Sequence, residues 1–279
     1  MRDCPACAQV TGQRLLYSVN GCNILRCRNC GLGKAETCAF DPASYYTSKY
    51  FSGQESDGYA DYKTAEPVLR KEFARTVAFI RQWCNGGRLL EVGCAYGFFL
   101  HEAKKYFDVS GIELAADAAT YCQRSGLSVL HGVADETTLH RDERADVIVM
   151  LDVIEHLPDP RGTLALLGRH LEPGGIMVIT TGDFGSVVAR LSGKHWRLMT
   201  PPQHLWFFGR ESMVRFAESL DLSIEHLDHP SKIVPLSLIM FQLRRMLLAS
   251  VPVQLPAAGL GLPVNLFDAM RVVLRKPFS

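Results

Sequence analysis

The segment from Arg88 to Leu100 places the strongest constraint on the fold, because an apolar run passes directly into a glycine-rich turn. Residues 89–92 are typical of a buried strand, and the residues after Gly97 are typical of a helix. Gly93 and Gly97 permit backbone conformations that other residues rarely adopt, and they leave room for a ligand against the main chain. The segment therefore predicts a strand, turn and helix that bind a nucleotide-like ligand, with Glu91 beside it.

Strand-like and helix-like segments alternate along the rest of the chain. This alternation is typical of an α/β fold with a parallel sheet and helices on both faces. Short β-branched runs predict strands at 109–113, 128–130, 145–151, 176–180, 222–227 and 270–274. Amphipathic segments predict helices at 98–106, 115–125, 163–171 and 210–220.

Four cysteines near the N-terminus have the spacing of a zinc ribbon. The pairs Cys4-x2-Cys7 and Cys27-x2-Cys30 are separated by 19 residues. Each pair presents two thiolates to one ion, and two pairs complete a closed tetrahedral site. Four unligated buried cysteines are the alternative, but the repeated spacing favours structural zinc. We therefore expect a zinc ribbon over residues 1–40.

An aromatic segment follows the ribbon. Residues 41–75 contain Tyr45, Tyr46 and Tyr50, and Pro67 begins an amphipathic helix. The tyrosines are compatible with a lid over an active site and equally with a linker whose rings pack on the next domain. The sequence predicts that the remaining residues, 76–279, form the α/β domain.

Charge and hydropathy exclude some classes of partner. The 30 Lys and Arg against 29 Asp and Glu leave a formal charge of +1, so nothing indicates nucleic acid or an anionic membrane. The N-terminus lacks an apolar run, which makes the cytoplasm the default expectation.

Arg244 and Arg245 interrupt an apolar insertion at 230–264, which is then too short to span a bilayer. We expect the insertion to pack on the sheet; a partner surface, a membrane-touching helix or a wall of the substrate pocket are alternatives.

The glycine turn differs from the dinucleotide fingerprint G-x-G-x-x-G, because Ala95 and Phe98 stand where that motif needs glycine. The order Glu91-x-Gly93-x-Ala95-x-Gly97 instead resembles the E-x-G-x-G-x-G signature of class I S-adenosylmethionine-dependent methyltransferases. Segments 146–157 and 171–175 are similar to the fourth strand with its following loop and to the Leu-x-Pro-Gly-Gly turn of that family.

The resemblance implies a Rossmann-like seven-stranded sheet with strand order 3-2-1-4-5-7-6, the seventh strand being antiparallel. It also implies S-adenosylmethionine as methyl donor. Glu113 matches the acid that binds both ribose hydroxyls, whereas the adenine contact falls to Asp135 or to the backbone of Ala134. The residues expected to bind the donor are Glu91, Gly93, Ala95, Gly97, Glu113, Ala134, Asp135 and Asp152.

The loop after the fourth predicted strand carries Asp152-x-x-Glu155-His156, and His204 follows later in the chain. This set is similar to the residues with which ubiquinone-biosynthesis and small-RNA O-methyltransferases hold a divalent ion. Two carboxylates and two imidazoles suit such an ion. The alternative, which we favour, is that Glu155 and His156 cap the following loop through local hydrogen bonds, which leaves one histidine as general base or none. Glu155, His156 and His204 are the expected catalytic residues in either case.

These features predict methyl transfer to a small-molecule acceptor, most simply a hydroxyl oxygen of a sugar or secondary metabolite. Transfer to carbon or nitrogen of a similar molecule is an alternative. From other classes, an NAD-dependent oxidoreductase and a catalytically inactive binding scaffold remain. A nucleic-acid reader is disfavoured because the ribbon has few basic residues before Cys30, namely Arg2, Arg14, Arg26 and Arg28.

Overall fold

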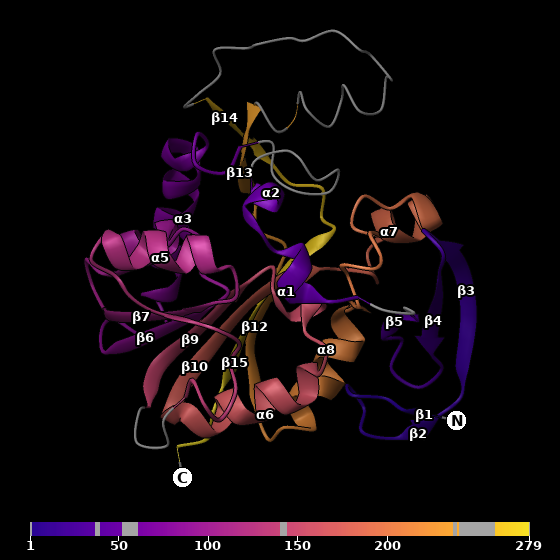
Figure 1. Cartoon of the computed structure of the whole chain (residues 1–279). Helices are drawn as coiled ribbons and strands as arrows, with labels where there is room; N and C mark the ends of the chain where they lie inside the picture. The colour runs from indigo at the N-terminus through magenta and orange to yellow at the C-terminus, as the bar shows by residue number, and fades with distance from the viewer. Residues whose placement is uncertain are drawn as a thin grey trace, which may run out of the picture.

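A seven-stranded sheet forms the centre of the computed structural model, which describes residues 2–36, 40–51, 61–139, 144–236, 239 and 260–278. Its strands are β6 (Arg88–Val92), β7 (Asp108–Glu113), β8 (Ser128–His131), β9 (Ala145–Leu151), β10 (Leu171–Gly182), β12 (Ser223–Asp228) and β15 (Ala269–Arg275). They lie in the order β12-β15-β10-β9-β6-β7-β8 (Figure 1). Strand β15 runs antiparallel to both of its neighbours, β10 and β12. The strand order implied by the family resemblance is confirmed.

Helices cover both faces of this sheet. One face carries α3 (Glu66–Ile80), α4 (Phe98–Ala103) and α5 (Ala116–Arg124), and the other carries α6 (Pro160–His170) and α8 (Arg210–Glu218). Strand β9 shows why two faces are covered, because Val147 and Val149 join one buried cluster whereas Ile148 and Met150 join the other. A continuous apolar run in a parallel strand is buried on both sides in this way.

Helix α6 begins earlier than the predicted residue 163, because its start is capped. The side chain of Asp159 accepts a hydrogen bond from the N–H of Gly162, and Pro160 occupies the first turn, where its missing N–H is not needed. After His170 the chain enters β10 at once. The Leu-x-Pro-Gly-Gly segment is a bulge within β10, between Leu171 and Ile176, instead of a separate turn before the strand. Helix α4, in contrast, is shorter than predicted and ends at Ala103.

The N-terminal region contains β1 (Arg2–Asp3), β2 (Val10–Thr11), β3 (Gln13–Val19), β4 (Cys22–Cys27) and β5 (Gly33–Glu36). Strands β3 and β4 form a hairpin, with Asn20 and Gly21 both at positive φ as a type I′ turn requires. Strand β11 (Trp206–Phe207), from the α/β domain, pairs with β5 and completes a four-stranded sheet. The ribbon is therefore joined to the α/β domain by backbone hydrogen bonds.

Two short helices, α1 (Pro42–Tyr45) and α2 (Ser48–Phe51), lie between the ribbon and α3 near the α/β sheet (Figure 1). Aromatic side chains from α2 and from the segment before α3 pack on the glycine turn and on the helix that follows it. Phe51 contacts Tyr96 with ring centroids 5.1 Å apart, and Tyr62 stacks on Phe98 at 5.3 Å. The aromatic segment thus covers the start of α4.

A further hairpin of β13 (Lys232–Pro235) and β14 (Gly261–Val264) forms the two ends of the predicted apolar insertion. Residues 237, 238 and 240–259 of that insertion lie outside the described residues. The remaining short elements are α7 (Val187–Ser192) and the 3-10 helices η1 (Ile154–His156) and η2 (Gly193–His195). Within the described ranges, no helix combines the length and the apolar character that a membrane crossing needs.

Candidate active site

The glycine turn joins β6 to α4 in a left-handed conformation. Gly93, Ala95 and Gly97 have φ of 75°, 46° and 73°. A Cβ on Gly93 would lie 2.6 Å from Val153 Cγ2, and one on Gly97 would lie 2.5 Å from Leu127 Cδ1. Glycine is therefore required at these two positions by backbone conformation and by close contact with protein side chains. Ala95 adopts the same left-handed conformation although it has a Cβ, because its side chain is small.

Two buried glutamates lie under this turn. Glu113, at the end of β7, accepts hydrogen bonds from the N–H groups of Ala95 at 2.6 Å and Ala115 at 2.7 Å. Burial raises the pKa of Glu113, and these hydrogen bonds oppose the rise. Glu91 is 3% exposed, and its Oε2 atom has no hydrogen-bond partner among the described residues. Burial holds the pKa of Glu91 well above its usual value.

A cavity of about 720 Å³ opens at the ends of β7 and β8, beneath Tyr46 and Thr47. Asp135 lines this cavity, and its carboxylate accepts hydrogen bonds from Thr137 and Thr138, which lower its pKa. The side chain of Ala134 packs against the core instead. The other lining residues are Leu114, Ala116, Asp117, His131, Gly132, Val133, Thr137 and Thr138.

Three of the four residues in the predicted histidine–acid set come together. Glu155, His156 and His204 each offer a ligand atom, and these atoms lie within 4.8 Å of one another. The two imidazole rings meet edge to face with centroids 4.7 Å apart. Glu155 and His156 lie on η1, and the backbone of Leu205 donates to the Glu155 carbonyl, which brings the segment containing His204 against η1. We call these three residues the Glu–His–His cluster.

The tautomer of His156 follows from its partners. Its Nδ1 atom lies 2.9 Å from the backbone carbonyl of Gln203 and 2.8 Å from the hydroxyl of Tyr46. A carbonyl can only accept, so Nδ1 carries the proton in a neutral ring. The Nε2 atom is then left with its lone pair. Burial lowers the pKa of His156, which favours this neutral form.

The other two members of the cluster are also shifted. Burial, reinforced by the neighbouring Asp152, raises the pKa of Glu155 to about 8, although Thr181 donates a hydrogen bond of 2.9 Å to its Oε2. Burial and His156 lower the pKa of His204 to about 3. Glu155 is buried and the two histidines are half-buried, so the cluster contains one carboxyl group and two neutral imidazoles.

Asp152 lies outside the Glu–His–His cluster. Its backbone is left-handed with φ of 57°, and its carboxylate pairs with Lys232 at 2.6 Å and accepts from Thr180 at 2.9 Å. Burial alone would raise the pKa of Asp152, but Lys232 and Thr180 outweigh it and lower the pKa. Lys232 begins β13, so this ion pair ties the loop after β9 to the hairpin of β13 and β14.

The four predicted cysteine ligands are also gathered in one place. The Sγ atoms of Cys4 and Cys30 are 3.5 Å apart, and those of Cys7 and Cys27 are 4.0 Å apart. Four sulfurs bound to zinc at about 2.3 Å lie about 3.8 Å apart in a tetrahedron. Cys30 lowers the pKa of the Cys4 thiol to about 5 through a shared hydrogen bond. The donor set and its dimensions fit a zinc ion.

Sequence reasoning missed the groups that hold the site together. Tyr46 both lines the cavity and contacts His156, which links the cofactor-sized cavity to the Glu–His–His cluster. Gln203 orients His156, and Lys232 pairs with Asp152. The abundance of tyrosine in residues 41–75 was the signal available for Tyr46, but it was equally compatible with a linker. No pattern in the sequence indicates the other two contacts.

The arrangement of the fold is matched by a family comparison. A model described as a methyltransferase domain matches residues 65–227, which is more than half of the chain. The chain belongs to this methyltransferase domain family. The match covers the glycine turn, Glu113, the loop after β9 and His204.

Curated relatives of this methyltransferase domain are similar over part of their length. The ubiquinone biosynthesis O-methyltransferase of Methylococcus capsulatus is 31% identical over 103 residues, which are 34% of this chain and 44% of that protein. The protein of the same name from Cereibacter sphaeroides is 30% identical over 132 residues, or 44% of this chain and 53% of that protein. The chain thus spans about half the length of the curated relatives it matches.

Solved structures show the same fold. One is a chain from the complex between the Haloferax volcanii Trm112 methyltransferase activator and a methyltransferase, with a TM-score of 0.54 and 13% identity over 80% of this chain and 98% of that chain. Another is the plantazolicin methyltransferase BpumL in complex with SAH, with a TM-score of 0.52 and 15% identity over 85% of this chain and 91% of that chain. At these identities the likeness establishes the fold.

Proposed function

We propose that this protein transfers a methyl group from S-adenosylmethionine to a hydroxyl oxygen of a small-molecule acceptor, such as a sugar or secondary metabolite. The observation that carries the proposal is the position of Tyr46, which lines the cavity at the ends of β7 and β8 and also contacts His156. A donor held in the cavity and an acceptor held at His156 would lie next to each other, on either side of the Tyr46 side chain. Open α/β sheets bind ligands at this edge.

The donor would be held by the glycine turn and the acids beneath it. The orphaned Oε2 of Glu91 and the cavity beside Glu113 fit a ligand with hydroxyl and amino groups. Glu113 would accept from the ribose hydroxyls, with Gly93, Ala95 and Gly97 against the ligand and Asp135 near the adenine. The SAH bound to BpumL, a protein of the same fold, supports this choice of donor.

His156 would act as the general base. With Nδ1–H directed to the Gln203 carbonyl, Nε2 can take the acceptor hydroxyl proton as the new oxygen–carbon bond forms and the carbon–sulfur bond breaks. The products are the methyl ether, S-adenosylhomocysteine and an imidazolium ion. Glu155, close to His156, would stabilise that cation.

The Glu–His–His cluster also fits a divalent ion, because one carboxylate and two neutral imidazoles form a three-ligand set with room for an acceptor oxygen. Such an ion would lower the pKa of a bound hydroxyl. Asp152, paired with Lys232, would not be among its ligands. Restoration of turnover by Mg²⁺ or Mn²⁺ after EDTA treatment of zinc-loaded protein would assign the ion; full activity in EDTA would leave His156 acting alone.

At the ribbon, we propose that Cys4, Cys7, Cys27 and Cys30 hold one structural zinc ion. All four positions of a tetrahedral ion would be occupied by sulfur, so the ion would have no catalytic position. Its contribution would be to fold the ribbon and to place β5 beside β11.

Calorimetry with S-adenosylhomocysteine tests the methyltransferase proposal. We expect binding in the micromolar range for the wild type, at least tenfold weaker for Glu113→Ala and intermediate for Glu113→Gln, which keeps one acceptor oxygen. Glu218→Ala, an exposed change on α8, is the matched control and should bind as the wild type does.

Other results would revise or overturn the proposal. Unchanged affinity in Glu113→Ala would remove Glu113 from the donor site. Tight binding of NADH without binding of S-adenosylhomocysteine would favour an NAD-dependent oxidoreductase, and absence of both would favour an inactive scaffold. Methyl transfer to carbon or nitrogen would appear as a product stable to ether cleavage.

A further inference from the structure

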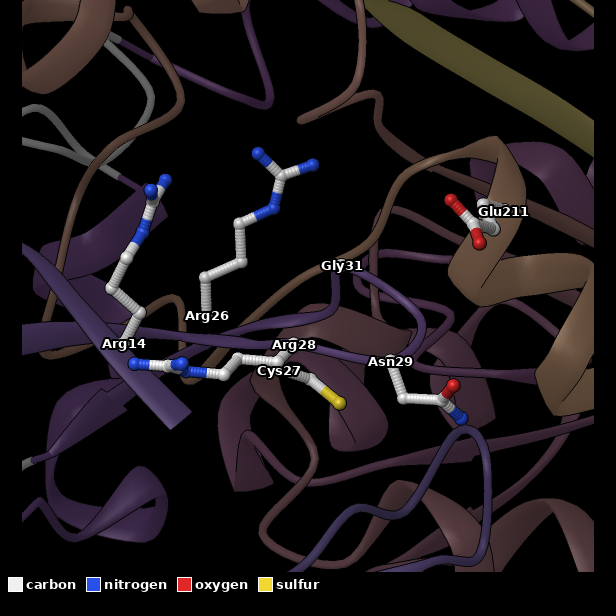
Figure 2. A pocket seen from close by; sticks show the side chains of 7 residues that line it. All are labelled: Arg14, Arg26, Cys27, Arg28, Asn29, Gly31 and Glu211. Atoms are coloured by element: carbon white, nitrogen blue, oxygen red, sulfur yellow. The ribbon is translucent and has the colours of Figure 1, made fainter. Parts of the chain in front are cut away.

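A second cavity, of about 370 Å³, lies on the ribbon between the hairpin of β3 and β4 and helix α8. Three arginines line it, and Figure 2 shows Arg14 and Arg26 extending in the same direction from their strands, with Glu211 opposite them on α8. We call this the arginine cavity. Its remaining lining residues are Cys27, Arg28, Asn29 and Gly31.

Two of these arginines face each other across the hairpin. Arg14 and Arg26 are direct partners in the antiparallel register of β3 and β4. Like charges at directly opposed positions destabilise a strand pair. Arg28 follows in the turn after β4 and also lines the cavity. The hairpin therefore holds positive charges close together, although fewer positive charges at these positions would make it more stable.

No carboxylate compensates this charge within the described part of the chain. None of the three arginines forms an ion pair there, whereas Arg70 pairs with Glu102 and Arg197 pairs with Asp268. Glu211 lines the same cavity but does not come within 4.0 Å of an arginine nitrogen. Glu211 is the carboxylate among the lining residues, and the thiolate of Cys27, which also lines the cavity, would add negative charge once the proposed zinc site forms.

The guanidinium group of Arg26 is held in place. It lies 5.7 Å from the centroid of the Phe184 ring, and a Cβ on Gly31 would be 3.1 Å from its Nη2 atom. Phe184 packs against Phe207 at 5.7 Å, and Phe207 lies 6.3 Å from the ring of His204. A cation fixed between an aromatic ring and the main chain loses little entropy when it binds an anion.

We propose that the arginine cavity binds the diphosphate group of a small molecule, of the kind that nucleoside diphosphates carry. Arginine forks match phosphate oxygens in geometry, and the directly opposed Arg14 and Arg26 offer one guanidinium group to each of two linked phosphoryl groups. This binding site is separate from the cavity at β7 and β8 and does not depend on the methyl transfer proposed above.

Titration of the zinc-loaded full chain with inorganic pyrophosphate, at fixed ionic strength and with acetate as the monoanion comparison, tests this proposal. We expect pyrophosphate to bind at least tenfold more tightly than acetate. The double variant Arg14→Gln/Arg26→Gln should weaken pyrophosphate binding at least tenfold. Glu211→Gln should strengthen it by about threefold, because an opposing charge is removed.

Arg124→Gln is the matched control, since Arg124 is an exposed arginine on α5 far from the ribbon, and it should bind pyrophosphate as the wild type does. Zinc content and the melting temperature of each variant establish that the ribbon is intact. Pyrophosphate binding that is unchanged in the double variant, or no tighter than acetate binding, overturns the proposal. Salt-sensitive binding of an RNA fragment without pyrophosphate binding would also overturn it and assign the arginines to a nucleic acid backbone.

Discussion

The sulfur cluster of the ribbon and the Glu–His–His cluster are both sets of metal-binding side chains, but they are assembled in different ways. The four cysteines lie in two short knuckles that a single hairpin brings together. The other cluster joins η1 to a segment 48 residues later; Gln203 of that segment and Tyr46 from a third part of the chain orient His156. One cluster is local in the sequence and the other depends on the packed domain.

Because the clusters are assembled differently, we expect substitutions in them to affect different properties of the protein. Loss of a cysteine removes a group that the ribbon needs in order to fold, because so small a sheet has little core of its own. Loss of a histidine removes a reactive group from a site that the large sheet already supports. We therefore expect stability effects at the ribbon and activity effects at the Glu–His–His cluster.

The largest effect is expected for Cys27→Ser. This variant should lose stoichiometric zinc and lower the melting temperature by about 10 °C, because the ribbon and its pairing with β11 unfold together. Metal analysis and thermal melting measure both quantities. Cys22→Ser, on the same strand but outside the knuckles, is the control and should retain zinc. Full zinc content in Cys27→Ser would show that the four sulfurs are not the zinc ligands.

His156→Ala should lower turnover by about 10²- to 10⁴-fold, the usual contribution of a general base. Binding of S-adenosylhomocysteine and zinc content should not change, because neither depends on this ring. Single-turnover assays with an accepted substrate measure the first quantity and calorimetry measures the second. His195→Ala, an exposed change on η2, is the control. Wild-type turnover in His156→Ala would exclude it as the base.

Asp268→Asn tests the contact between the two regions and should have the smallest effect. Asp268 is buried and accepts hydrogen bonds from Trp196 and Arg197. On the ribbon side, Trp196 belongs to the same buried cluster as Ile24. On the side of the Glu–His–His cluster, His204 hydrogen-bonds to the backbone of Leu198. Burial would raise the pKa of Asp268, but Arg197 and Trp196 outweigh it and lower the pKa.

Because the pKa of Asp268 is lower in the folded state, its stabilising contribution exists above the unfolded pKa of about 3.9 and is lost as the pH falls. Asp268→Asn should therefore reduce the free energy of unfolding by about 2 kcal/mol at pH 7. The difference from the wild type should shrink below about pH 4. Urea unfolding of the variant and the wild type at pH 7 and below pH 4 measures this difference in free energy, with Glu136→Gln as an exposed control. An equal difference at both pH values would rule out this carboxylate as the cause.

Much of the fold could be predicted because its signals are local. The β-branched run at Ala145–Leu151 and the glycine turn at Gly93 and Gly97 are readable from periodicity and residue type alone. The start of α6 was missed by three residues, although Asp159 and Pro160 form a recognisable cap. The pairing of β11 with β5 could not be predicted, because a two-residue strand has too few residues for a pattern.

The sequence by itself determined the strand order implied by the family motifs, the cysteine spacing and the acids at the ends of β6 and β7. Only the tertiary structure decided that Asp152 pairs with Lys232 while Glu155, His156 and His204 converge. It also decided that Arg14 and Arg26 share a cavity with Glu211. The physical reason is that backbone periodicity is set by near neighbours, whereas the partner of a charged side chain is set by which distant segments the hydrophobic core brings together.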